Sequence, residues 1–198
     1  LKTLEEPPGG TFLFLVTAQP GRLPATIVSR CQRIVAPRPS AGVARAWLAG
    51  RGVDQVEIAL ARAGFAPLAA LAIAEGDENS ERGRWLRAFA DPAALAVTSW
   101  GARIDQVPRE RRRERVLTMI EWLLAWCADL ARVRAGAAAL RHPDLAAELT
   151  ALARSVAPRA LFRYHRRLLR VRAALAVPLQ PRLVAEALLI DYQELFGR

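Results

Sequence analysis

The segment LPATIVSRCQR, from Leu23 to Arg33, bears most directly on the fold. The apolar run FLFLV (Phe12–Val16) before it has the composition of a buried strand, and a short helix entered through Pro24 is expected next. A second short strand is expected at 33–35. This order is typical of the end of an α/β domain. It predicts that Arg30 lies at the rim of a sheet, where its guanidinium can grip a phosphate outside its own chain.

The rest of the chain predicts helices. Ala and Leu dominate an apolar content of 53%, a composition that favours packed helices over sheets. Ser40 is the expected N-cap of the first helix, and Asn79 or Ser80 that of the helix carrying Trp85, Leu86 and Phe89. Helices are expected over about 40–49, 53–63, 67–75, 80–90, 92–104, 109–133, 143–156, 158–175 and 181–196. The fold class is therefore mainly α.

Charge and cysteine content bear on whether the protein binds nucleic acid, contains disulfides or zinc, or contacts a membrane. The net charge is +10 and Lys2 is the only lysine, so arginines spread through the helices carry nearly all the positive charge, which permits a nucleic-acid partner without requiring one. Cys31 and Cys127 lie far apart without further thiols or histidines at ligand spacing, which argues against disulfides and zinc. With no signal-peptide pattern and no charge-free apolar run of membrane length, we expect a cytoplasmic protein without membrane contacts.

Three separated segments carry a family resemblance. LKTLEEPP (Leu1–Pro8), VTAQPGR (Val16–Arg22) and the Ser29-Arg30-Cys31 motif together resemble the Ser-Arg-Cys region of bacterial clamp-loader AAA+ subunits. WCADLARVRAG (Trp126–Gly136) resembles the Trp-x-x-Asp-Leu segment of the collars of the DNA polymerase III δ′ family. QPRLVAEALL (Gln180–Leu189) is similar to the last helix of those collars, although the family often has Asn at the position of Gln180.

The resemblance implies an architecture and a role. It implies the end of an AAA+ domain at 1–36, a helical lid at 37–90 and a helical collar for oligomerisation at 91–198, with the amino-terminal nucleotide-binding core absent from the sequence. The partners implied are the γ/τ and δ subunits, and through the complex the sliding clamp and primed DNA. Arg30 matches the arginine finger that this family offers in trans to ATP–Mg on a neighbouring subunit. Thr17 matches the first sensor, which we expect to be vestigial in this chain.

The lid distinguishes δ′ from its ATPase paralogue γ/τ. In an ATP-hydrolysing member the resemblance places a second-sensor arginine within GFAPLAALA (Gly64–Ala72), where Pro67 stands in this chain and Leu68 is equally unable to contact phosphate. Arg62 is the candidate if the alignment is shifted. No phosphate loop of the type Gly-x-x-x-x-Gly-Lys-[Ser/Thr] occurs in the sequence. These features favour a δ′ chain that binds no cofactor and catalyses nothing itself, within the DNA polymerase III holoenzyme, a DNA-directed DNA polymerase.

Two rival functions stay open at this stage, a γ/τ ATPase subunit and an Arg-rich helical DNA-binding protein. Arg159, Arg163, Arg166 and Arg170 share one helix face, and RERRRER (Arg109–Arg115) opens another helix. A solvated face is the ordinary explanation of both runs, and interleaved acids with an absence of aromatics argue against a platform for single strands. His142 is expected at a helix entry and His165 at the surface, neither with a nucleophile to activate.

Overall fold

The computed structural model describes residues 2–75, 78–175 and 179–197. The chain forms two units, Leu1–Pro39 and Ser40–Arg198, each of which is described by itself. In the described ranges all regular secondary structure is helical, which confirms the mainly α fold class. No single helix there is long and apolar enough to cross a membrane, and the one bent pair that passes by length and composition, α4 with α5, turns through 109°.

The first unit contains short helical turns and long extended segments. Its helices are α1 (Lys2–Glu5), the 3-10 turn η1 (Pro20–Arg22) and α2 (Ala25–Val28), which begins after Pro24 as predicted. The predicted strands at 12–16 and 33–35 are wrong for the described residues, where neither segment forms a strand. A strand needs a ladder partner for its N–H and C=O groups, and neither segment has one. Phe12, Phe14 and Val16 are exposed as a result.

The second unit begins with three short helices, α3 (Ala41–Ala49), α4 (Val56–Arg62) and α5 (Pro67–Glu75). The Ser40 hydroxyl accepts the Val43 N–H at 3.4 Å, so the predicted N-cap is confirmed. A small apolar cluster joins the three helices; its buried members are Ala44, Leu48, Ala59, Leu60 and Ala70.

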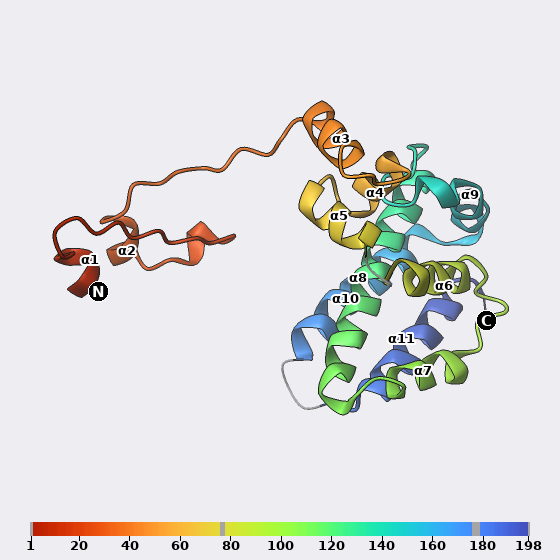
Figure 1. The fold of residues 1–198 in the computed structure, drawn as a ribbon. Helices are drawn as coiled ribbons and strands as arrows, with labels where there is room; N and C mark the ends of the chain where they lie inside the picture. Colours follow the sequence, from red (N-terminus) through yellow and green to blue (C-terminus); the bar gives the residue numbers. More distant parts are fainter. Residues whose placement is uncertain (1, 76–77, 176–178, 198) are drawn as a thin grey trace. The chain divides into compact units, whose positions relative to one another are not determined.

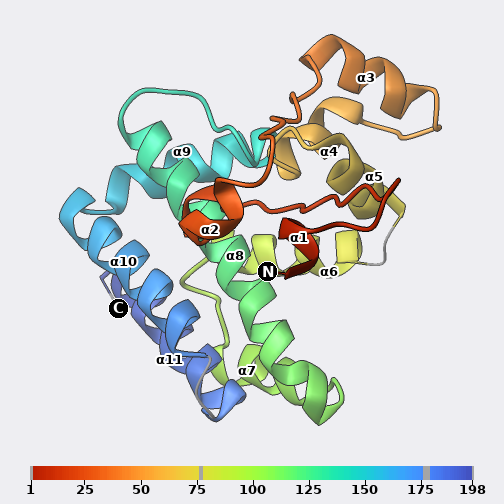
Figure 2. The same ribbon diagram turned by 90° about the vertical axis from the view of Figure 1, so that its left-hand side faces the viewer.

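A larger helical bundle follows. Its elements are α6 (Glu78–Ala90), α7 (Val97–Asp105), α8 (Arg109–Arg134), η2 (Pro143–Leu145), α9 (Ala146–Ser155), α10 (Pro158–Ala174) and α11 (Pro181–Glu194). The long helix α8 runs through this bundle and packs against α6, α7, α9, α10 and α11 (Figures 1 and 2). Proline opens α10 and α11 as predicted, because its missing N–H has no helical partner at that position.

Some predicted helix starts are wrong, most clearly those of α6 and α7. Helix α6 begins at Glu78, so Asn79 and Ser80 lie inside it and do not precede it. Helix α7 begins at Val97 and not near Pro92, because the preceding residues form a turn in which the Asp91 carboxylate accepts the Ala94 N–H at 3.1 Å. The Gln193 amide of α11 donates to the carbonyls of Pro92 (2.8 Å) and Leu95 (3.0 Å) and holds this turn against the bundle.

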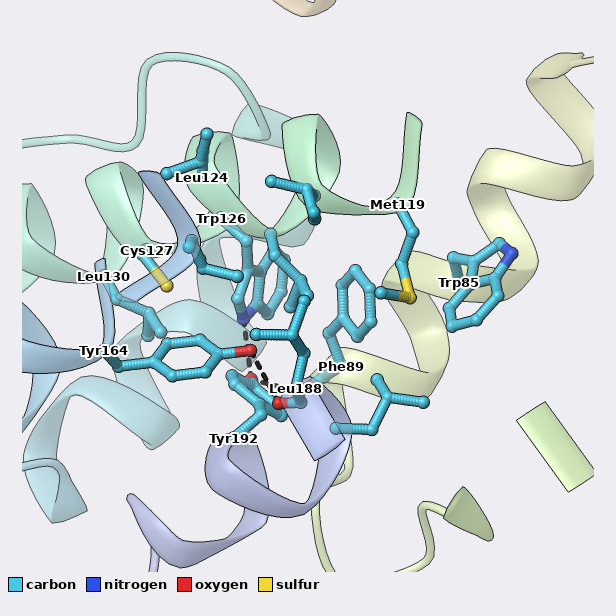
Figure 3. Packing of buried hydrophobic residues seen from close by; sticks show 14 of the residues in the cluster. Trp85, Phe89, Met119, Leu124, Trp126, Cys127, Leu130, Tyr164, Leu188 and Tyr192 are labelled. Atoms are coloured by element: carbon cyan, nitrogen blue, oxygen red, sulfur yellow. Dashed lines mark hydrogen bonds between the residues drawn. The ribbon is translucent and has the colours of Figure 1, made fainter. Parts of the chain in front are cut away.

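A chain of polar contacts crosses the apolar core of the bundle (Figure 3). The Trp126 indole N–H donates to the Tyr192 hydroxyl at 2.8 Å, and that hydroxyl donates to the Phe89 carbonyl at 2.7 Å. The Tyr164 hydroxyl donates to the Leu188 carbonyl at 2.9 Å. These bonds join α6, α8, α10 and α11 at buried positions. The prediction that Trp126 belongs to the core is confirmed, and Trp122 packs against the same cluster, partly buried. The boundaries of the expected lid and collar, 37–90 and 91–198, stay predictions.

Candidate functional site

Arg30 follows α2 and lies at the surface of the first unit. The side chain is 38% exposed, and one guanidinium nitrogen donates to the Thr26 carbonyl at 2.9 Å. Another nitrogen pairs with the Glu5 carboxylate at 2.8 Å. The guanidinium is thus held at two points by partners of its own unit, and one of them is an anion. An exposed pair of this kind contributes only about 0–1 kcal/mol, so a better anion can replace Glu5 at little cost.

The neighbours of Arg30 make only local contacts. The Ser29 hydroxyl donates to the Thr26 carbonyl at 3.4 Å, and Cys31 is a free, half-buried thiol. The exposed Thr17 hydroxyl accepts the Gln19 N–H at 3.0 Å, a short-range turn contact, and its assignment as a vestigial sensor stays a prediction. Arg30 is therefore the residue of this motif best suited to bind a ligand.

The position of the expected second sensor contains no donor for phosphate. Pro67 is the first residue of α5 and is half-buried, and Leu68 beside it is exposed. Arg62, the alternative candidate, pairs with Asp144 of η2 at 2.9 Å, and its carbonyl accepts from the Arg141 guanidinium at 3.4 Å. Arg62 thereby joins α4 to η2 inside the second unit.

A buried Asp–His pair in the bundle was not predicted from the sequence. Asp129 of α8 is fully buried and accepts the backbone N–H groups of Leu140 (2.9 Å), Arg141 (2.8 Å) and His142 (2.8 Å). The His142 Nδ1 lies 3.0 Å from the same carboxylate, so that nitrogen carries the proton. The carboxylate thereby fixes the loop that enters η2. His142 precedes η2, as predicted, but it is buried against Trp126 in an edge-on ring contact.

The surroundings set the charge of both groups. Burial disfavours the charged form of Asp129, but the hydrogen bonds from His142 and three backbone N–H groups outweigh it and lower the carboxyl pKa. Burial lowers the pKa of His142, and the charge of Arg82 acts in the same direction. Burial, with a smaller effect of Arg62, also lowers the pKa of the Arg82 guanidinium to about 10. Because four hydrogen bonds from residues 140–142 converge on the Asp129 carboxylate, the pair holds this loop against α8.

The outer face of α10 is basic and carries an aromatic residue. Arg159, Arg163, Arg166 and Arg170 are exposed, as their spacing predicts. The expectation that aromatics are absent from the basic faces is wrong here, because Phe162 is 60% exposed and lies three residues after Arg159 and four before Arg166. By contrast, two arginines of RERRRER pair with acidic residues of other helices: Arg112 pairs with Asp105 of α7, and Arg115 pairs with Glu81 of α6.

Comparison with known proteins gives the family. A family model described as DNA polymerase III, delta subunit, matches residues 1–39, and one described as DNA polymerase III, delta subunit, C terminal, matches residues 109–194. The DNA polymerase III subunit delta′ of Escherichia coli K12 is 31% identical over 161 residues, which is 80% of this chain and 46% of that protein. The chain belongs to the DNA polymerase III δ′ family.

Two shorter similarities accompany this match. The subunit delta′ of Pseudomonas aeruginosa is 45% identical over 74 residues, 35% of this chain and 23% of that protein. The DNA polymerase III subunit tau of Bacillus subtilis is 58% identical over 33 residues, 17% of this chain and 6% of that protein. The chain thus spans about half or less of each curated relative. The long match to a δ′ protein and the short one to a τ protein agree with the choice of δ′ over γ/τ made from Pro67.

Proposed function

We propose that this chain acts as the δ′ subunit of a bacterial DNA polymerase III clamp loader, a structural partner of γ/τ and δ during ATP-driven loading of the sliding clamp onto primed DNA. In this role Arg30 is an arginine finger offered in trans to ATP–Mg on a neighbouring subunit. The observation that carries the proposal is the exposed guanidinium of Arg30, in a segment that matches the polymerase III delta-subunit model.

The contacts of Arg30 explain how a finger of this kind can act. The Thr26 carbonyl orients one side of the guanidinium, while the Glu5 carboxylate occupies the position of a competing anion. When a γ-phosphate approaches, the planar fork exchanges the carboxylate for phosphate oxygens and keeps its carbonyl contact. The added positive charge then stabilises the negative charge that spreads over the transferring phosphoryl group, an effect of about 10³–10⁵ in rate for arginine fingers.

The second unit supplies the assembly surface in this proposal. Its bundle leaves apolar side chains exposed on α10 and α11, among them Leu183 and Ile190, beyond those that its own core buries. We expect the residues of this sequence to bind no nucleotide by themselves, since they contain no phosphate loop and have Pro67 at the second-sensor position. Its collar, about 91–198, joins the collars of γ/τ and δ.

The test replaces Arg30 in the subunit assembled with its cognate γ/τ and δ. Arg30→Ala should leave assembly intact, because the side chain is at the surface, and should slow ATP hydrolysis at the single γ/τ site that faces it by about 10³-fold or more. The other sites continue, so total ATPase falls modestly while clamp loading falls sharply. Arg30→Lys should rescue poorly, since an ammonium has no planar fork.

Two controls make the result specific to the guanidinium of Arg30. Arg33→Ala removes another exposed arginine of the same segment, and Cys31→Ala changes the adjacent motif residue. Both should load clamps at the wild-type rate. Normal assembly together with wild-type loading by Arg30→Ala would show that Arg30 is a helix-end residue without a role in hydrolysis.

A further inference from the structure

The outer face of α10 carries positive charge that forms no ion pair with any acidic residue in the part of the chain that the structure describes. Residues 149–185 contain no Asp or Glu. Arg167 and Arg172, toward the sides of the helix, pair with Asp191 and Glu121. The four arginines of the outer face form no ion pair among the described residues; they are Arg159, Arg163, Arg166 and Arg170. In both ribbon views α10 lies at the edge of its bundle (Figures 1 and 2).

The spacing of these arginines suits a row of phosphates. They recur every three or four residues, so a rise of about 1.5 Å per residue sets them in a line of about 16 Å. A stacked nucleic-acid strand carries a phosphate about every 3.4 Å along its axis, so the line spans about four or five phosphates of one strand. A protein partner would need several carboxylates at matching positions, whereas a nucleic-acid backbone provides a phosphate at every nucleotide.

Phe162 favours a single strand over a duplex. Its ring is 60% exposed between Arg159 and Arg166 along the helix. Unpaired bases stack on exposed aromatic rings, and a basic groove beside such rings is the usual surface for single strands. In a duplex the bases are already stacked and paired, so the ring would have no base to contact. The opposite side of α10 is occupied by the bundle core, where Leu161, Tyr164 and Leu168 are buried.

We propose that the outer face of α10 binds single-stranded nucleic acid, with backbone phosphates on Arg159, Arg163, Arg166 and Arg170 and a base stacked on Phe162. This activity belongs to the second unit alone and is independent of Arg30. It goes beyond the proposed role in the clamp loader, because it gives the chain its own contact with nucleic acid.

Fluorescence anisotropy of the whole chain with a labelled oligothymidine of about 20 nucleotides tests the proposal. Four phosphate contacts predict a slope of about −2.8 for log affinity against log salt, or about 50-fold weaker binding between 50 and 200 mM salt. Replacing Arg163, Arg166 and Arg170 by Gln should reduce the magnitude of the slope by about 2. The matched control replaces three exposed arginines of α8, Arg109, Arg111 and Arg113, by Gln and should leave the slope unchanged.

Phe162→Ala separates stacking from charge. It should weaken binding by about 5- to 150-fold without changing the salt slope, while Leu169→Ala, a nearby partly exposed apolar residue, should not weaken it. Equal losses of oligonucleotide affinity in the two triple-Gln variants would show that net charge alone accounts for the binding, which would overturn the proposal. Tighter binding to a duplex than to the single strand would also overturn it. The proposal would also be overturned if the triple-Gln variant of α10 kept its oligonucleotide binding but no longer assembled with γ/τ.

Discussion

At the scale of single residues, Asp129 is kept in its charged form by hydrogen bonds that outweigh the effect of burial on its pKa. It is a buried carboxylate on a helix that otherwise turns apolar side chains to the core, and four N–H donors from residues 140–142 surround it. A carboxylate left in such a position without donors would be strongly destabilising, and donors left without the carboxylate are costly for the same reason.

Asp129→Ala should therefore be among the most destabilising substitutions in the chain. We expect the free energy of unfolding to fall by about 3–5 kcal/mol, since the substitution leaves three backbone N–H groups and the His142 ring N–H without acceptors. The control is Glu57→Ala, which breaks the exposed pair with Arg45 and should cost about 1 kcal/mol or less. Urea denaturation measures both values, and similar losses in the two variants would contradict the structural role of Asp129.

The sequence did not predict this pair, although part of the signal was present. Asp129 lies three residues after Trp126, on the face that α8 buries, and an acid there needs donors. The donors come from a loop whose backbone N–H groups have no sequence signature, so only the fold could identify them. The role of Arg30, by contrast, rests on its motif and stays a prediction; the structure places the side chain at the surface with a Glu5 contact that no pattern indicated.

At the scale of elements, helix starts with a local cause were predicted well. Ser40 before α3 and proline at the first residue of α5, α10 and α11 act within one turn of the chain, so the local sequence is sufficient. The predicted strands at 12–16 and 33–35 failed because a strand depends on a partner elsewhere in the chain. The start of α7 was missed because Asp91 stabilises a turn where the apolar pattern favours a helix.

The hydroxyl of Tyr192 links three elements, and Tyr192→Phe tests that link. Its removal leaves the Trp126 indole N–H and the Phe89 carbonyl buried without that partner, so we expect a loss of about 1–3 kcal/mol in unfolding free energy. Tyr164→Phe is the matched control, because it removes one buried hydroxyl that contacts only the Leu188 carbonyl, and should cost about 0.5–1.5 kcal/mol. A larger loss from Tyr164→Phe, measured by the same urea titration, would contradict the proposed importance of the Trp126–Tyr192–Phe89 chain.

At the scale of the whole molecule, the buried pair couples stability to pH. Burial lowers the pKa of His142 below its ordinary value of 6.5, so between the folded and unfolded pKa values the unfolded chain binds the proton and the folded chain does not. Stability therefore falls as the pH drops below about 6.5. Asp129, whose pKa lies below the ordinary 3.8, adds a second loss as the pH falls further through about 4 and below. Both groups act in the same direction.

The contribution of His142 can be isolated by comparing slopes, whatever the absolute stability of the variant. Unfolding free energies of the wild type and of His142→Asn, measured by urea denaturation from pH 8 to 5, should diverge in their pH dependence. The wild type should lose up to about 1.4 kcal/mol per pH unit more than the variant below pH 6.5, the limit for one proton. Asn cannot titrate, so its curve should be flatter over this range. Parallel curves would mean that His142 takes up its proton equally in the folded and unfolded chain, which its burial beside Arg82 should prevent, since burial outweighs the hydrogen bond to Asp129 that favours the protonated form.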